Sequence, residues 1–248
     1  MSGRAVLVTG ASRGIGRAIA VEFATAGDRV AVHHRGSAEL AEQLAAELPG
    51  TGHAVVQADL ADPDAIATMV DSAASMLGGL DVLVNNAGVF TPHPITEVSY
   101  QEWRDQWRAT LGINLIGAAN VTWCAVQHMR RGGGRIINVS SRGAFRGEPH
   151  SPAYGASKAG LNAFSQSLAV ALAQFGIAVS AVAPGFVATD MTNEHLKPSR
   201  GDDIRAQSPF GRVGEPAEIA AAVLFLASER AEWASGAVLD LNGASYLR

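Results

Sequence analysis

The chain has 248 residues, of which 48% are apolar and 17% charged, and this composition suits one large α/β domain with a sizeable buried core. The formal net charge is −4 and there is no long basic run, which argues against nucleic acid as the main partner. An apolar run begins almost at the N-terminus, so we expect no signal peptide, and the most apolar stretch, Ile219 to Ala227, is too short to cross a bilayer. We therefore expect a soluble, cytoplasmic protein with no membrane partner.

Short apolar runs alternate with longer helical patterns along residues 1–248. The runs predict strands at Ala5–Thr9, Arg29–His33, Ala54–Gln57, Val82–Asn85, Arg135–Ser140, Ala178–Ala183 and Ala237–Leu241. The patterns predict helices at Gly14–Ala26, Ala38–Leu48, Pro63–Leu77, Tyr100–Met129, Pro152–Phe175 and Pro216–Ala227. Because the strands are almost continuously apolar, we expect them to be covered on both faces. The prediction is a single-domain α/β fold, a Rossmann-type doubly wound sheet of about seven parallel strands with helices on both faces.

The segment from Gly185 to Glu215 lacks a regular pattern, and connections of this length in a compact domain are usually functional. Residues 186–210 are rich in polar and turn-forming residues and have few apolar anchors. We expect a substrate lid near residues 186–210 that is mobile without ligand and orders when cofactor and substrate bind. The alternative is a static surface loop.

A glycine-rich loop, Thr9-Gly10-Ala11-Ser12-Arg13-Gly14-Ile15-Gly16, joins the first predicted strand to the first predicted helix. Glycines there allow a sharp turn and a close approach to a pyrophosphate, which the positive end of the helix attracts. The spacing is TGxxxGxG, and its place between strand and helix predicts a dinucleotide site.

The second informative motif is Tyr154-Gly155-Ala156-Ser157-Lys158. Residues four apart lie on one face of a helix, so Lys158 can sit beside the Tyr154 ring. A nearby cation favours phenolate and lowers the pKa of a tyrosine from about 10 toward the range useful for general acid–base catalysis. A bound oxidised nicotinamide would add a second positive charge.

With these motifs in order, the chain resembles the short-chain dehydrogenase/reductase family over essentially its full length, and most of all its 3-oxoacyl-[acyl-carrier-protein] reductase-like branch. The matching residues are TGASRGIG at 9–16, Asp59-Leu60, NNAG at 85–88, Asn114, Ser141, YGASK at 154–158, Pro184-Gly185, Thr189 and the turn from Arg212 to Pro216.

The resemblance implies a catalytic set of four residues. Tyr154 would be the general acid, and Lys158 would lower its pKa and hydrogen-bond the nicotinamide ribose. Ser141, at the family's spacing before the tyrosine, would hold the substrate carbonyl. Asn114 would sit in a helix distortion and hold a water that passes protons toward Lys158. Hydride addition builds negative charge on the carbonyl oxygen, so two fixed donors at that oxygen suit the chemistry.

The second predicted strand ends in His33-His34-Arg35, where an NAD-preferring site usually places a carboxylate at the position of His34. Arg13 and Arg35 could instead converge on a 2′-phosphate, which favours NADP(H). The predicted cofactor-binding residues are Gly10, Ser12, Arg13, Gly14, Ile15, Gly16, Arg35, Asp59, Leu60, Asn86, Ala87, Gly88, Tyr154, Lys158, Pro184, Gly185, Val187 and Thr189. The remaining histidines lack metal-ligand spacing, so we expect them at the surface or site rim and expect no catalytic metal.

These observations predict an NADPH-dependent reductase of a ketone or 3-oxoacyl-type carbonyl, taking a small-molecule carbonyl or acyl thioester. The alternatives are an NAD(P)-dependent dehydrogenase of a sugar alcohol, steroid or other secondary alcohol, and a nucleotide-sensing protein without enzymatic activity. Arg130 and Arg131 could dock an acyl carrier protein, but Gln174-Phe175-Gly176 stands where a basic residue is expected, which argues against that partner. The family pairs the Tyr100–Met129 and Pro152–Phe175 helices across a two-fold axis, so we expect a homotetramer. We expect Leu161, Phe164, Leu168 and Leu172 to supply the excess apolar surface that such pairing buries.

Overall fold

The computed structural model describes residues 3–189 and 198–248, so the middle of the predicted lid lies outside the described residues. Within that part of the chain the strands form one parallel sheet of seven, in the order β3-β2-β1-β4-β5-β6-β7. They are β1 (Ala5–Val8), β2 (Arg29–His34), β3 (Ala54–Gln57), β4 (Val82–Asn85), β5 (Gly134–Val139), β6 (Ile177–Pro184) and β7 (Val238–Leu241). The predicted Rossmann-type sheet is confirmed, and each strand lies within two residues of its predicted bounds.

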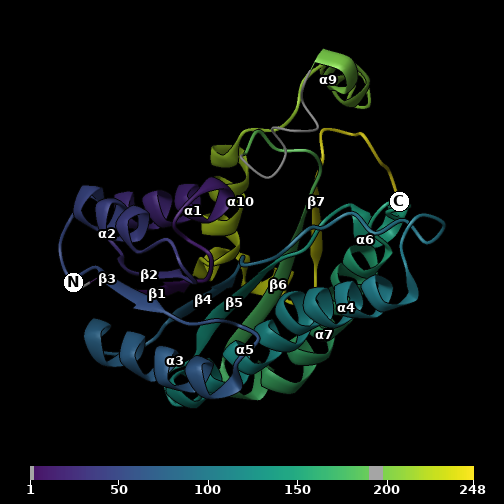
Figure 1. Cartoon of the computed structure of the whole chain (residues 1–248). Helices are drawn as coiled ribbons and strands as arrows, with labels where there is room; N and C mark the ends of the chain where they lie inside the picture. The colour runs from purple at the N-terminus through teal and green to yellow at the C-terminus, as the bar shows by residue number, and fades with distance from the viewer. Residues whose placement is uncertain (1–2, 190–197) are drawn as a thin grey trace.

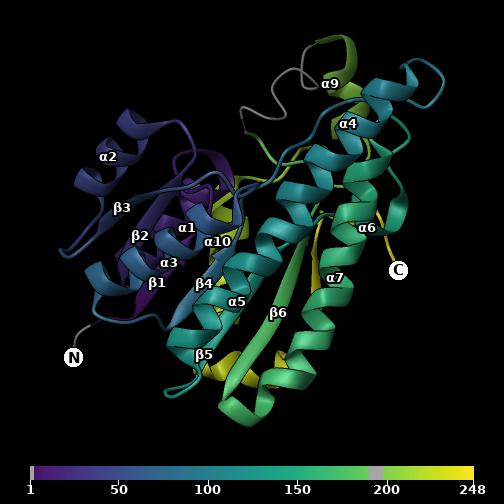
Figure 2. The same ribbon diagram turned by 60° about the horizontal axis from the view of Figure 1, so that its bottom comes forward.

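Helices cover both faces of this sheet (Figures 1 and 2). The helices of one face are α1 (Gly14–Thr25), α2 (Ala38–Glu47) and α10 (Pro216–Leu226). Those of the other face are α3 (Pro63–Leu77), α5 (Ala118–Met129) and α7 (Pro152–Leu172). Along β1, Val6 and Val8 pack toward the first group, whereas Ala5 and Leu7 pack toward the second. This two-sided burial is the reason that the strands are apolar at consecutive positions.

The predicted helix over Tyr100–Met129 is continuous but not uniform. It consists of α4 (Tyr100–Leu111), a π-helical turn η1 (Gly112–Gly117) and α5. A capping box between Ser99 and Glu102 starts it. By length and composition alone this run could cross a membrane, although its most apolar window is 39% buried. One side of α5 packs in the core through Val121, Ala125 and Met129.

Three short elements were not predicted from the sequence: α6 (Gly143–Arg146), α9 (Pro198–Arg205) and the 3₁₀ turn η3 (Glu229–Ala234). A further 3₁₀ turn, η2 (Ala173–Phe175), forms the end of the predicted helix Pro152–Phe175. Helix α9 lies in the segment expected to be irregular, and it stands beyond the carboxyl ends of the strands, away from the sheet (Figure 1). The lid region therefore has regular structure in its second half.

The apolar surface differs from the prediction in which residues supply it. Of the four predicted residues, Leu161 and Leu172 are buried within the chain, at 1% and 8% exposure, whereas Phe164 and Leu168 are half-buried. The exposed apolar side chains on the outer side of α5 and α7 are instead Trp123 and Val170, at 69% and 83% exposure.

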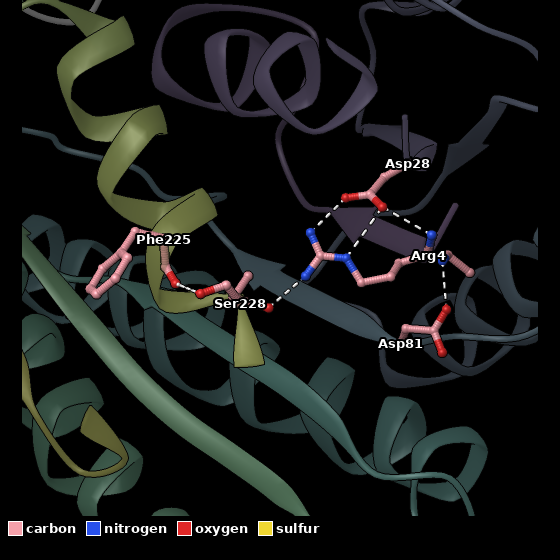
Figure 3. Close-up of polar contacts among 7 residues, drawn as sticks. Arg4, Asp28, Asp81, Phe225 and Ser228 are labelled. Atoms are coloured by element: carbon pink, nitrogen blue, oxygen red, sulfur yellow. Dashed lines mark hydrogen bonds and ion pairs between the residues drawn. The ribbon is translucent and has the colours of Figure 1, made fainter. Parts of the chain in front are cut away.

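An ion pair fixes the amino-terminal edge of the sheet (Figure 3). The Arg4 guanidinium donates to both carboxylate oxygens of Asp28, at 3.2 and 2.7 Å, and to the carbonyl of Ala227 at 2.6 Å. Asp81 accepts from the backbone N–H of Ala5 at 2.7 Å. Arg4, just before β1, therefore links Asp28, just before β2, to the end of α10, at the opposite end of the strands from the glycine-rich loop.

Candidate active site

A cavity of about 760 Å³ opens at the carboxyl ends of the strands, beside β1 and β4, where the strand order reverses. This is where open α/β sheets bind ligands. All of the predicted cofactor and catalytic residues line it except Asn114. The lining also includes residues that were not predicted to take part: His33, His34, Gly36, Ser37, Ala58, Val89, Phe90, Thr91, Ile113, Val139 and Ser140.

The glycine-rich loop has the conformation that a pyrophosphate site needs. Gly10 and Gly14 have φ of +63° and +57°, a region that favours glycine. A Cβ on Gly16 would lie 2.3 Å from the carbonyl oxygen of Gly10. Arg13 is the N-cap of α1 and makes no capping bond through its side chain. The first N–H groups of α1 therefore face the cavity rather than a capping side chain.

Asn86 holds the glycine-rich loop from β4. Its side-chain amide donates to the carbonyls of Thr9 and Gly10, at 2.8 and 3.0 Å. The Thr9 hydroxyl accepts in return from the N–H groups of Asn86 and Ala87. The Asn86 side chain, predicted to line the adenosine ribose, is thus engaged with the loop itself.

His33 is a second brace for this loop, and sequence reasoning gave it no role. Its Nδ1 accepts from the Gly10 N–H at 2.9 Å, and its Nε2 lies 3.1 Å from the carbonyl of Ala58. These contacts require a neutral ring that carries its proton on Nε2. Burial lowers the pKa of His33 to about 4, so the ring stays neutral at physiological pH. His33 thereby joins the glycine-rich loop to the end of β3.

The end of β2 has no carboxylate, as predicted. His34 is buried and its Nδ1 has no hydrogen-bond partner among the described residues. Arg13 and Arg35 are exposed, line the same end of the cavity, and form no ion pair within the described part of the chain. Asp59 is exposed there too, and its Oδ1 accepts from the Ala61 N–H at 2.9 Å.

The far end of the cavity is formed by the segment that follows β6. The Gly185 N–H donates to the Leu241 carbonyl at 3.0 Å, and Val187 pairs with Gly214 in an isolated parallel β-bridge. Thr189 reaches back to the glycine-rich loop: a Cβ on Gly14 would lie 3.4 Å from its Cγ2. The predicted carboxamide residues therefore close the cavity opposite β2.

Tyr154 and Lys158 lie together on α7, facing the cavity. The Lys158 Nζ is 5.7 Å from the centre of the Tyr154 ring and donates to the Val139 carbonyl at 2.8 Å. Burial lowers the pKa of Lys158 to about 8. Burial also raises the pKa of Tyr154 to about 12, although a hydrogen bond with Ser141 acts in the opposite direction. The expectation of a lowered tyrosine pKa is wrong for the protein alone, because desolvation exceeds the effect of the neighbouring groups.

Asn114 lies in the π-helical turn, so the predicted helix distortion is present. Its amide accepts from the Val89 N–H at 2.8 Å and donates to the Val89 carbonyl and to the Ser157 hydroxyl. A Cβ on Gly88 would lie 3.3 Å from Asn114 Oδ1 and 3.6 Å from Lys158 Nζ. Asn114 is therefore close to the lysine but behind the cavity wall.

His93 positions the start of the catalytic helix and corrects a prediction, because it was expected at the surface. It is fully buried, with Nδ1 2.7 Å from the Thr91 carbonyl. Its Nε2 accepts from the N–H of Ala153, the residue before Tyr154, at 3.2 Å. The imidazole thus caps the first turn of α7. Thr91 is two residues away, but Ala153 is sixty residues away, so no local signal in the sequence indicates the contact with α7.

Among the described residues, no group of three or more histidine, cysteine, aspartate or glutamate side chains is placed to hold a metal ion. The glycine-rich loop at the switch point, together with a tyrosine–lysine pair in the same cavity, defines the class: a dinucleotide-dependent oxidoreductase.

Comparisons with known proteins agree with that class. The family model described as "Enoyl-(Acyl carrier protein) reductase" matches residues 10–243. The chain is 40% identical over 247 residues to the 3-oxoacyl-[acyl-carrier-protein] reductase of Staphylococcus aureus (strain Mu50), covering 98% of each chain. It is 41% identical over 254 residues to an L-rhamnose 1-dehydrogenase (NAD(P)(+)) of Azotobacter vinelandii, covering 98% of this chain and 97% of the relative.

A short-chain dehydrogenase from Burkholderia cenocepacia J2315, solved in complex with NADP, superposes with a TM-score of 0.89 at 34% identity, covering 98% of each chain. The chain belongs to the short-chain dehydrogenase/reductase family, and it is an oxidoreductase of the kind that interconverts CH–OH and C=O groups.

Proposed function

We propose that this enzyme is an NADPH-dependent reductase that converts a ketone or 3-oxoacyl-type carbonyl into a secondary alcohol. The observation that carries the proposal is that Ser141, Tyr154 and Lys158 line the same cavity as the glycine-rich loop. A nucleotide-sensing protein has no need of such a set of donors. The 40% identity to a 3-oxoacyl-[acyl-carrier-protein] reductase supports the substrate class.

In the proposed mechanism, the hydroxyl groups of Ser141 and Tyr154 both donate to the substrate carbonyl oxygen. NADPH, when bound, supplies the hydride. Tyr154 gives its proton to the oxygen as negative charge develops there. A raised tyrosine pKa suits this direction, because the phenol is protonated at neutral pH and ready to act as an acid. Lys158 holds the nicotinamide ribose, and Asn114 holds a water that restores protons toward Lys158.

NADP(H) is the proposed cofactor because the end of β2 offers cations and no carboxylate. Arg13 and Arg35 would bind a 2′-phosphate, for which guanidinium geometry is well suited. Buried His34 occupies the position where NAD-preferring sites place an acid. The Burkholderia structure with NADP supports this choice. The remaining proposed cofactor contacts are those predicted from the sequence, of which Asn86 would act by holding the glycine-rich loop.

The second candidate is an NAD(P)-dependent dehydrogenase of a sugar or another secondary alcohol. The observation in its favour is the 41% identity to an L-rhamnose 1-dehydrogenase. That direction needs the tyrosine as a base, and the raised pKa of Tyr154 makes it a poor one without a further cation in the cavity.

We further propose a cytoplasmic homotetramer in a single-domain chain, with a substrate lid near residues 186–210. Exposed Trp123 and Val170 would be covered between subunits along α5 and α7. Arg130 is exposed at the end of α5, as docking of an acyl carrier protein requires, but Gln174 occupies the position where a second basic site is expected. A small-molecule thioester is therefore the preferred substrate.

A panel of ketones, 3-oxoacyl thioesters and secondary alcohols, with NADPH or NADP⁺ and read by NADPH absorbance, tests the proposal. Reduction of a 3-oxoacyl thioester by the wild type supports it. Exclusive oxidation of sugar alcohols would favour the second candidate instead.

A further inference from the structure

A second cavity, of about 310 Å³, lies next to the candidate active site, between the end of the lid region and the end of β7. The two cavities share a wall: Phe186 lines the second, and its neighbours Gly185 and Val187 line the first. The second cavity is at the small end of the range for ligand pockets. Among the described residues, none of the predicted catalytic or cofactor-binding residues lines it, whereas Phe186, Ile204, Ser208 and Phe210 of the predicted lid do.

Four charged residues line this second cavity, and three of them are already paired. Arg212 donates to both carboxylate oxygens of Glu218, at 2.8 and 2.7 Å. Asp240 accepts from the Arg248 Nε through its Oδ2 at 2.9 Å. The fourth is Arg142, and no ion pair joins it to a carboxylate in residues 3–189 and 198–248. Among the described residues, Arg142 is therefore the charged residue of this wall that has no ion pair.

A positive charge on Arg142 has a desolvation cost, because the residue is only 5% exposed. Its partners are neutral: the Ser245 hydroxyl at 2.5 Å, the Gln207 side-chain oxygen at 2.6 Å and the face of the Phe186 ring at 4.9 Å. A guanidinium has five N–H groups, and these two hydrogen bonds use two of them. Burial and the neighbouring Arg146 lower the pKa of Arg142 to about 10, so it remains protonated at neutral pH.

A second cation points at the same acceptor. Arg146 donates to the Gln207 oxygen at 2.9 Å, so two guanidinium groups converge on one neutral amide oxygen. Glu148 acts in the opposite direction and raises the pKa of Arg142 electrostatically. Neither Arg146 nor Gln207 lines the second cavity, so Arg142 is the arginine that an oxyanion bound there would meet. A hydrogen bond from its guanidinium to that oxyanion would be charge-assisted.

A carboxylate in the lining of this cavity lacks a hydrogen-bond donor on one oxygen. Asp240 leaves its Oδ1 buried and without a hydrogen-bond partner among the described residues. Asp240 would repel a ligand that carries only a negative charge, whereas a hydroxyl on the same ligand would donate a hydrogen bond to its Oδ1. We propose that this cavity binds a small hydroxycarboxylate, with its carboxylate toward Arg142 and its hydroxyl toward Asp240.

A purely structural role for Arg142 is the competing explanation. Its bonds to Gln207 and Ser245 connect the loop after Ser141 to the lid region and to the C-terminal tail. Such a tie needs hydrogen bonds but no net charge. Only a ligand site requires the positive charge of Arg142 as well as its hydrogen bonds.

Calorimetric titration with 2-hydroxy-2-methylpropanoate tests the site. This probe has a carboxylate and a tertiary hydroxyl, so it cannot be oxidised to a ketone, and binding is measured apart from turnover. Two matched probes separate the contributions: 2,2-dimethylpropanoate lacks the hydroxyl, and 2-methylpropane-1,2-diol lacks the carboxylate. We expect the hydroxy acid to bind more tightly than dimethylpropanoate, and the diol not to bind.

Arg142→Met should weaken binding of the hydroxy acid about tenfold or more. Arg131→Met, at an exposed arginine away from the cavity, is the control and should bind as the wild type does. Asp240→Leu should abolish the preference for the hydroxy acid over dimethylpropanoate. If Arg142→Met does not fold, Arg142→Gln replaces it. Equal binding of the hydroxy acid and the diol by the wild type, or full affinity in the charge-removing variants, would overturn the proposal. Neither result depends on the proposed reductase activity.

Discussion

Replacing Tyr154 with Phe removes the proposed proton donor and keeps the ring. The phenyl group would retain the edge-to-face contact with Phe90, whose ring centre is 4.9 Å away at an interplanar angle of 82°. Lys158 would keep its place, because it is held by the Val139 carbonyl rather than by the phenol. Ser141 would lose its hydrogen bond with the phenol but would still accept from the Gly143 N–H at 3.0 Å. General acid catalysis contributes about 10²–10⁴ in rate, equivalent to about 2.7–5.5 kcal/mol of barrier. We expect kcat to fall by that factor.

The assay is steady-state reduction of a 3-oxoacyl thioester at saturating NADPH, together with NADPH affinity by fluorescence and a thermal unfolding midpoint. Affinity and midpoint should change little, because the variant loses only one hydroxyl. Tyr100→Phe, at a tyrosine that is 77% exposed on α4, is the matched control and should retain full activity. Retention of more than about a tenth of kcat by Tyr154→Phe would refute the assignment.

Four further outcomes follow from the same geometry. Arg35→Asp should weaken NADPH binding about tenfold or more relative to NADH, measured by fluorescence titration, and equal loss for both cofactors would contradict the 2′-phosphate role. Gly16→Ala should lower the free energy of unfolding by about 1–3 kcal/mol in urea, because its Cβ would lie 2.3 Å from a backbone carbonyl oxygen, and unchanged stability would contradict the close approach. Asp28→Asn should cost about 1–2 kcal/mol in the same assay, between the values for exposed and buried pairs, since the Arg4 side chain is 35% exposed; a stabilised variant would show that the pair is not favourable. Reductase activity should fall as pH rises through about 8, where Lys158 loses its proton, and a flat profile to pH 10 would exclude that lysine as the required cation.

The sheet could be predicted because its strands are buried on both faces. Continuous apolar runs such as that of β6 have no other stable placement in a chain of alternating strands and helices. The short elements α6 and η3 could not be predicted, because they are held by neighbouring segments rather than by a periodic pattern of their own. Two of the four apolar residues expected at the surface of α7 are buried for a related reason: which face of α7 is covered depends on how the helix packs, and Leu161 and Leu172 face inward.

Much of the candidate site could also be read from the sequence, because its residues follow strand ends that meet at one edge. The side chains that brace the site could not. His33 and His93 bind backbone groups of distant segments, at Gly10 and Ala153, and neither partner is visible in the local sequence. Arg142 follows Ser141 directly, but an arginine in a loop is usually solvated, and only the fold shows that it is buried. The pKa of Tyr154 was misjudged because desolvation depends on the packing around α7.

The most direct test of the account follows the hydride itself. NADPH carrying deuterium at the transferred position of the nicotinamide is incubated with the enzyme and a 3-oxoacyl thioester, and the product is examined by mass spectrometry. If NADPH supplies the hydride and Tyr154 the proton, the wild type should yield alcohol with one deuterium on the new carbinol carbon, and Tyr154→Phe should yield almost none in the same time. NADPH consumption without deuterium in the alcohol, or label transfer at the wild-type rate by Tyr154→Phe, would contradict it.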